Sequence, residues 1–107
     1  MAIRVRVCRV DDVPPGEMRG FDVPGLVSPI LVARVDGRLV ATASVCPHED
    51  VSLLHGHFAG SRVVCPGHGY AFDVVTGRCQ HDPGLELPRH RVEIVDDEVY
   101  VVIGAGG

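Results

Sequence analysis

The chain has 107 residues, which is enough for one domain and too few for a second sizeable core. A formal net charge of −4 disfavours binding to nucleic-acid phosphates, and a hydrophobic content of 46% disfavours intrinsic disorder. The sequence shows neither an apolar run of the roughly 20 residues that cross a bilayer nor a signal-peptide block, so we expect a soluble, cytoplasmic protein away from the membrane.

Short Val-rich segments separated by Gly and Pro predict an all-β fold. Residues 3–10 (IRVRVCRV) alternate as a half-buried strand does, with one face formed by Ile3, Val5 and Val7. The linker that follows at 11–18 (DDVPPGEM) contains two prolines and a glycine, so no regular structure is expected there.

Two hairpins are predicted, one before and one after the middle of the chain. The first spans 30–44 and turns at Asp36-Gly37, a dipeptide that favours a tight turn. The second spans 89–103 and turns at Asp96-Asp97. No long helix is expected, although 51–54 (VSLL) could form a short helical turn. These strands predict one β framework that covers residues 1–107.

The segment from about 45 to 84 is rich in Gly, Pro and His and has only short apolar pieces. Such a segment buries little apolar surface by itself, so something else must hold it in shape. A bound metal centre could do so, because the free energy of ligation also stabilises the folded state. We therefore expect a loop-rich, metal-binding subdomain inserted into the β framework.

Two matched motifs in this insert bring cysteine and histidine together. The first is CPHED, with Cys46 and His48, and the second is CPGHGY, with Cys65 and His68. In a reducing cytosol such cysteines are more often metal ligands than disulfides. Cys8, in an alternating strand, is interpreted as a small buried hydrophobic residue.

The four side chains leave two kinds of metal site open. Thiolate and imidazole suit zinc, iron and copper and exclude magnesium and calcium. One candidate is a closed tetrahedral zinc site, and the other is a [2Fe–2S] cluster with both cysteines on one iron and both histidines on the other. Paired zinc ligands usually have about two to four residues between them. Cys46 and His48 have one, which favours the more extended cluster.

Beyond these ligands, the sequence resembles the Rieske iron–sulfur domain over nearly its whole length. The resemblance includes CPGHGYAFDVVTGRC, the linker VDDVPPGEM and the closing DPGLELPRHRVEIVDDEVYV. It implies three antiparallel β-sheets with a small cluster-binding subdomain. It also implies that Cys46 and Cys65 bind the inner iron and His48 and His68 the outer iron. Gly67 and Gly69 would let the backbone approach the sulfides, and Pro83 would shield the cluster.

The resemblance also bears on the reduction potential. High-potential members carry two further cysteines, a serine and a tyrosine near the cluster, and the matching residues here are Val51, Gly67, Tyr70 and Phe72. Hydrogen bonds to the cluster stabilise its reduced state, so their loss predicts a low potential within the family range of roughly −150 to +300 mV.

A low potential excludes a quinol-oxidising subunit and agrees with a soluble one-electron carrier. The sequence shows no nucleophile elbow, phosphate-binding glycine loop or paired carboxylate, so we expect no substrate chemistry of its own. The resemblance implies the ferredoxin component of a bacterial aromatic-ring-hydroxylating dioxygenase system. This monomer would take electrons from an NAD(P)H-dependent ferredoxin reductase and deliver them to a terminal oxygenase that docks at the His48/His68 tip. The alternatives are a small Rieske subunit of a larger redox enzyme such as nitrite reductase, and a structural zinc module.

Other polar residues of the insert receive simpler interpretations. Glu49 and Asp50 are expected at the rim of the tip, where they could steer a basic partner or merely be solvated. The remaining histidines have no thiolate or carboxylate neighbours in sequence, and we interpret them as surface residues: His55, His57, His81 and His90.

Overall fold

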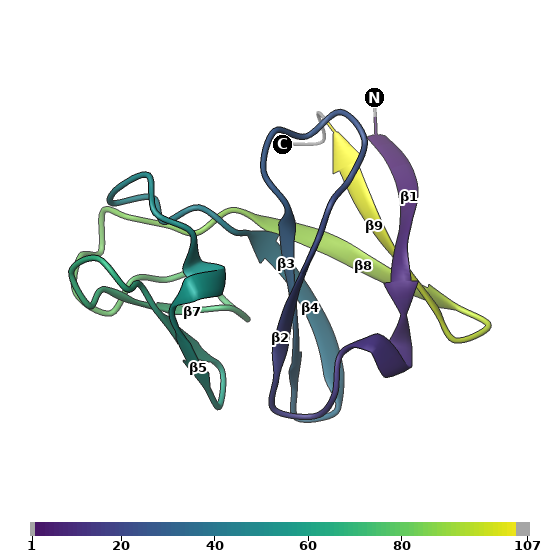
Figure 1. The fold of residues 1–107 in the computed structure, drawn as a ribbon, viewed down its shortest axis with the longest axis horizontal. Coiled ribbons are helices and arrows are strands. Elements are labelled where there is room, and N and C mark those ends of the chain that lie inside the picture. Colours follow the sequence, from purple (N-terminus) through teal and green to yellow (C-terminus); the bar gives the residue numbers. More distant parts are fainter. Residues whose placement is uncertain (1, 105–107) are drawn as a thin grey trace.

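The computed structural model describes residues 2–104 and confirms the all-β prediction (Figure 1). Its strands are β1 (Ala2–Arg9), β2 (Met18–Phe21), β3 (Ile30–Val35), β4 (Arg38–Ala43), β5 (His57–Ala59), β6 (Arg62–Val64), β7 (Ala71–Asp73), β8 (Arg89–Val95) and β9 (Glu98–Gly104). Within this range the helical segments are two 3₁₀ turns, η1 (Val10–Asp12) and η2 (Leu53–His55). No helix of the described residues has the length and apolar character that crossing a membrane requires.

The strands form a six-stranded sheet and a three-stranded sheet. The large sheet has the order β1-β9-β8-β4-β3-β2, and the small one has the order β5-β6-β7. The resemblance implied three sheets, and the difference arises at one junction. β4 and β8 pair only at Ala41↔His90 and Thr42↔Arg89, which joins β1-β9-β8 to β4-β3-β2 as one hydrogen-bonded sheet.

Strand β3 lies at the centre of the molecule and is buried on both faces. Its sequence ILVARV is almost continuously apolar, as expected of a strand that is covered on both sides. Leu31, Ala33 and Val35 pack in a core shared with the small sheet and its loops. Ile30 and Val32 pack in a second core with residues of β1 and β9. One strand therefore joins the framework to the insert.

Both predicted hairpins are confirmed. β3 and β4 are joined at Asp36 and Gly37, which have φ angles of 50° and 78°. β8 and β9 are joined at Asp96 and Asp97, with φ angles of 51° and 65°. Positive φ at both central residues is the backbone of a type I′ turn, whose twist matches that of the two strands. The second turn achieves this without a glycine.

Strand β1 departs from the expected alternation. Its pairing with β9 shifts register between Arg6 and Cys8, so a bulge interrupts the regular two-residue period. Cys8 is buried, with 3% of its surface exposed, as predicted. Val5 and Val7 are half-buried and pack on the same core, as expected of one strand face, whereas Ile3 is 58% exposed.

The linker after β1 is more ordered than predicted. It begins with η1, and the Arg34 guanidinium of β3 donates hydrogen bonds to the carbonyls of Val10 and Val13 at 2.6 and 2.8 Å. The linker then enters β2, which pairs with β3 from Met18↔Ala33 to Phe21↔Ile30. These contacts fasten a segment rich in proline to the edge of the large sheet.

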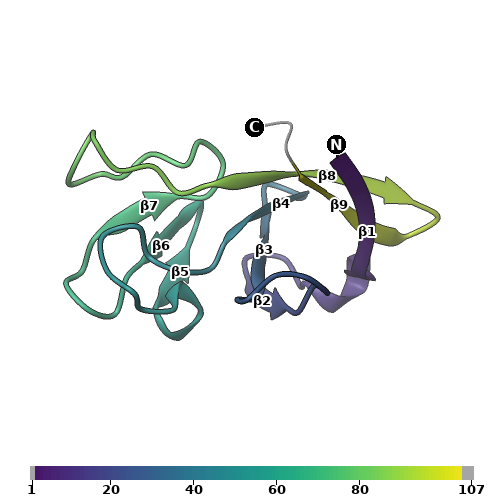
Figure 2. The same cartoon turned by 90° about the horizontal axis from the view of Figure 1, so that it is seen from above.

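The insert leaves and rejoins the large sheet at neighbouring points. It follows β4, which ends at Ala43, and returns to β8, which begins at Arg89. The Ala43 N–H donates to the Pro88 carbonyl at 2.9 Å, so the two ends of the insert are hydrogen-bonded to each other. Figure 2 shows the small sheet and its loops to one side of the large sheet.

Candidate metal centre

The two Cys/His motifs form loops that close in the same way. In the first, the Cys46 N–H donates to the Val51 carbonyl at 2.9 Å. In the second, the Cys65 N–H donates to the Tyr70 carbonyl at 2.8 Å. Each bond joins a cysteine to the residue five positions later. The repeated sequence pattern therefore produces a repeated loop.

Both cysteines of these loops point into the protein. Cys46 and Cys65 are 3% and 1% exposed and belong to the core shared with β3. Burial raises the pKa of the Cys46 thiol, and the adjacent Cys65 thiol acts in the same direction. The backbone N–H groups of Glu49 and His48 lower this pKa, because they stabilise a thiolate. The two sulfur atoms form the buried base of the site.

Both histidines lie at the exposed rim. The rings of His48 and His68 are perpendicular, with centroids 5.2 Å apart and an interplanar angle of 85°. The His68 side chain is 62% exposed. His48, Glu49 and His68 each offer a ligand atom within 4.8 Å of the other two, and no thiol belongs to this group among residues 2–104. Sulfur and nitrogen donors thus gather at two ends of the site, which fits an extended metal group better than a single tetrahedral ion.

Glu49 occupies a position that the sequence analysis did not foresee. Its carboxylate contacts His68 Nδ1 at 2.9 Å and receives a weak contact from the Cys65 thiol at 3.7 Å. The side chain is 24% exposed, so the carboxylate is partly withdrawn from solvent against His68. An iron bound to His68 Nδ1 would replace this carboxylate as the partner of the ring.

The glycines of the second loop have different roles. A Cβ on Gly67 would collide with the Glu49 carboxylate, so the loops approach each other closely at this point. Gly69 has a φ angle of +75° and open space around it, so here the backbone conformation favours glycine. Pro83, expected to shield the site, is exposed.

Tyr70 and His81 are aromatic neighbours of the predicted ligands. The Tyr70 ring stacks on His48 with a centroid distance of 4.1 Å and an interplanar angle of 20°. His81 stacks on Tyr70 at 5.4 Å and 23°, and its Nδ1 accepts the Ala71 N–H at 3.2 Å. His81 is exposed, as predicted, but it also contacts the site. The second motif places Tyr70 near the cluster, whereas no linear pattern signals His81.

The positions linked to a high potential carry no matching donor. Phe72 is completely buried in the core and has no hydroxyl group. Gly67 has no side chain, and Val51 is a partly buried hydrophobic residue. Tyr70 carries a hydroxyl, but its ring is engaged in the stack with His48.

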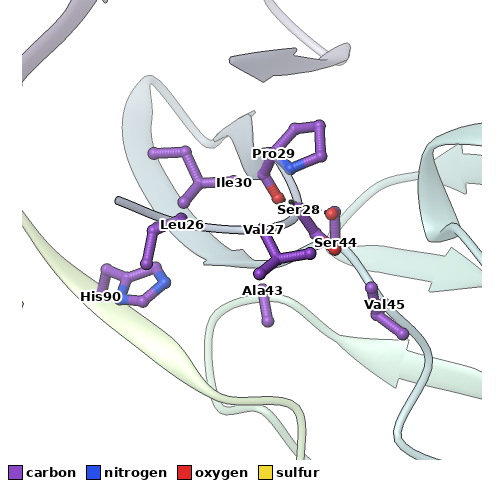
Figure 3. A pocket seen from close by; sticks show the side chains of 9 residues that line it. All are labelled: Leu26, Val27, Ser28, Pro29, Ile30, Ala43, Ser44, Val45 and His90. Atoms are coloured by element: carbon purple, nitrogen blue, oxygen red, sulfur yellow. Dashed lines mark hydrogen bonds between the residues drawn. The ribbon is translucent and has the colours of Figure 1, made fainter. Parts of the chain in front are cut away.

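The other candidate residues lie outside the site. His55 and His57 are exposed, as predicted, and Cys79 is a buried core residue, 7% exposed. His90 is partly buried on β8 and borders an apolar cavity of about 230 Å³ (Figure 3). The wall of this cavity reaches Val45, next to Cys46, but includes none of the four predicted ligands. Burial lowers the pKa of His90.

Comparison with known proteins agrees with this geometry. The model of the Rieske [2Fe-2S] domain matches residues 3–102. The chain belongs to the Rieske [2Fe-2S] family. This membership decides between the two metal groups that the donor set left open, because the cofactor of a Rieske domain is a [2Fe-2S] cluster rather than a structural zinc ion.

Similar proteins place the chain among small Rieske ferredoxins. Ferredoxin CarAc of Metapseudomonas resinovorans is 37% identical over 100 residues, which are 92% of each chain. The ferredoxin component of biphenyl 2,3-dioxygenase from Rhodococcus jostii (strain RHA1) is 33% identical over 102 residues, 94% of each chain. A solved complex of reduced oxygenase and oxidized ferredoxin in carbazole 1,9a-dioxygenase contains a chain with a TM-score of 0.84 and 36% identity, with 92% of each chain covered.

Proposed function

We propose that the two closed loops hold the [2Fe-2S] cluster, with Cys46 and Cys65 on the inner iron and His48 and His68 on the outer iron. The observation that carries this assignment is the position of the donors, with both thiols buried at the base and both imidazoles exposed at the rim.

Substitution of the four ligands tests this assignment. We expect Cys46→Ala, Cys65→Ala, His48→Ala and His68→Ala each to lower the iron and acid-labile sulfide content and to abolish the visible spectrum of the cluster. Cys79→Ala and His57→Ala are the matched controls, since Cys79 lies in the same core and His57 is exposed outside both loops. Full iron and sulfide content in a ligand variant, or cluster loss in a control, would contradict the assignment.

The proposed function is one-electron transfer from an NAD(P)H-dependent reductase to the terminal oxygenase of an aromatic-ring dioxygenase system. When bound, the cluster takes up and releases one electron. The chain keeps the sulfur end dry within its core and presents the imidazole end to solvent, so a partner reaches the cluster from the side of His48 and His68. The relatives that are ferredoxin components of dioxygenase systems support this role.

Three further features belong to this proposal. Residues 1–107 form a single Rieske domain, in which a cluster-binding subdomain of about 45–84 is inserted. The protein acts as a monomer, and it works in the cytoplasm, where its reductase has access to NAD(P)H. The solved complex of an oxygenase with its ferredoxin supports a transient docking partner of the same kind.

A rapid-mixing experiment tests the electron-transfer role. The dithionite-reduced protein, freed of excess dithionite, is mixed without oxygen with the oxidised terminal oxygenase of carbazole 1,9a-dioxygenase. We expect the visible spectrum of the ferredoxin to return to its oxidised form at a rate that rises with the oxygenase concentration. An equal concentration of a redox-inert protein is the control. If the oxygenase oxidises the carrier no faster than the inert protein does, transfer to this class of acceptor is excluded.

A further inference from the structure

Three aromatic rings form a row that begins at residues 80–84, the third loop of the insert, and ends at a predicted ligand. His81 stacks on Tyr70 at 5.4 Å, and Tyr70 stacks on His48 at 4.1 Å. The interplanar angles are 23° and 20°, so the rings are close to parallel. Aromatic pairs at these distances attract each other beyond the burial of their area. The row links residues that lie far apart in the sequence.

His81 is the fixed end of this row. Its Nδ1 accepts the Ala71 N–H at 3.2 Å, and the N–H of the preceding Gln80 donates to the Ala71 carbonyl at 2.8 Å. The third loop is thus bonded twice to Ala71, the first residue of β7, which is itself buried. A ring held in this way resists rotation, and it limits the positions that Tyr70 can take.

Among residues 2–104, no aromatic ring stacks in parallel on His68. Both histidines are exposed, but the His68 ring is perpendicular to that of His48 rather than stacked on it. Its ring contact is with the Glu49 carboxylate, through Nδ1 at 2.9 Å. The two histidines therefore differ in how firmly the protein holds them.

We propose that His81 is a positioning residue that acts through Tyr70 to fix the plane of the His48 ring. The inference rests on the proposed role of His48 as a ligand of the outer iron. Residues that surround a metal ligand set its orientation and thereby tune the metal. A ligand whose ring cannot turn about its metal bond also needs less rearrangement when the electron arrives or leaves. Tyr70 and His81 thus make one of the two outer ligands rigid.

Pulsed electron paramagnetic resonance of the reduced protein tests this proposal, because it resolves the nitrogen couplings of the two histidines. We expect His81→Leu and Tyr70→Leu to shift or broaden one of the two couplings and to leave the other unchanged. Tyr70→Phe keeps the ring and restores the wild-type coupling. His81→Asn keeps an acceptor for the Ala71 N–H but loses the ring, so it behaves as His81→Leu does. His57→Asn, an exposed histidine outside the row, is the control.

Two further measurements make the test specific. The Tyr70→Leu/His81→Leu double variant should show the coupling change of Tyr70→Leu alone, because His81 acts through Tyr70. The rate of electron delivery to the oxygenase should fall by about tenfold in His81→Leu. This is the lower limit of the usual effect of substituting a residue that supports a metal ligand. Iron and sulfide content is measured first. A wild-type chain without cluster refutes the proposed function, whereas a loaded His81→Asn variant with both couplings unchanged refutes the positioning role alone.

Discussion

Gly77 lies against the backbone of Leu87, where the insert turns back toward the large sheet. A Cβ on Gly77 would be 2.6 Å from the Leu87 carbonyl oxygen, and the Leu87 N–H donates to the Gly77 carbonyl at 2.7 Å. Gly77 also has a φ angle of +81°. Both the space and the conformation therefore require glycine at this position.

The first prediction is that Gly77→Ala strongly destabilises the protein. The left-handed conformation alone costs a residue with a Cβ roughly 1–2 kcal/mol, and the clash with Leu87 adds to this cost. Gly60→Ala is the matched control, because Gly60 has a φ angle of +65° but nothing within 4 Å of its Cβ position. Chemical unfolding should show a clearly larger loss of the free energy of unfolding for Gly77→Ala. Equal losses would show that the backbone contact is unimportant.

The second prediction concerns Asp73, which organises the turn after β7. Its carboxylate accepts the N–H groups of Val75 and Thr76 at 2.7 and 3.1 Å and the Ser61 hydroxyl at 3.2 Å. Asp73→Ala leaves these donors without their partner and should lower the free energy of unfolding by about 1–3 kcal/mol. Asp73→Asn keeps one acceptor oxygen and should lose less. The interpretation fails if both variants unfold at the same denaturant concentration.

The third prediction is a stabilising change in the hairpin of β8 and β9. Asp97 has a φ angle of 65°, a conformation in which glycine is unstrained and which it commonly adopts in type I′ turns. Relief of the left-handed strain, less the added flexibility of glycine in the unfolded chain, should raise the free energy of unfolding of Asp97→Gly by about 0.5–1 kcal/mol. The Asp97 carbonyl accepts the Val10 N–H at 2.9 Å, and this backbone bond survives the substitution. Thermal unfolding measures the gain, and Asp97→Ala, which retains the strain, should show none.

The fourth prediction is a loss of stability in mild acid caused by His90. Burial lowers the pKa of His90 in the folded state. The unfolded chain therefore takes up the proton first as the pH falls through the ordinary histidine value of about 6.5. The free energy of unfolding should decrease below this pH until the folded pKa is passed, and it should be insensitive to His90 above it. Unfolding curves recorded from about pH 7.5 to 5 cover the range in which histidine titrates. In these curves, His90→Gln should reduce the dependence of the free energy of unfolding on pH.

His57→Gln serves as the control for this pH dependence. His57 is exposed, so its proton uptake should depend little on folding. If the slope of stability against pH is the same in wild type and His90→Gln, burial of His90 does not contribute to it.

The fifth prediction is a low reduction potential. Phe72 has no hydroxyl, and Val51 and Gly67 offer no side-chain hydrogen bond to a cluster. The reduced state therefore lacks donors that stabilise it, and the midpoint should fall in the lower part of the family range of roughly −150 to +300 mV. Spectroelectrochemical titration of the loaded protein gives this value. A midpoint in the upper half of the range would mean that other groups stabilise the reduced state.

Local sequence signals predicted the features that depend on neighbouring residues. Asp36-Gly37 and Asp96-Asp97 marked the two hairpins, because a tight turn needs positive φ at adjacent positions. The paired motifs of Cys46 and Cys65 marked the site, because each loop is closed within its own motif. These features need no knowledge of distant parts of the chain.

Features that depend on distant contacts were missed. The bulge in β1 is set by its register against β9, and the ordering of the linker depends on Arg34 in β3. The contact of His81 with the site requires the third loop to return to Ala71. Spacing in the sequence carries no signal for such contacts, since they arise only when separate elements pack together.

The hydrogen bond between Ala43 and Pro88 has a consequence for how such proteins diversify. Because residues 44–88 begin and end at adjacent points of the large sheet, that entire stretch could be exchanged for one of different length or chemistry while the surrounding strands keep their pairing. The large sheet then serves as a constant scaffold, and sequence changes that alter what the protein binds can accumulate in the inserted residues.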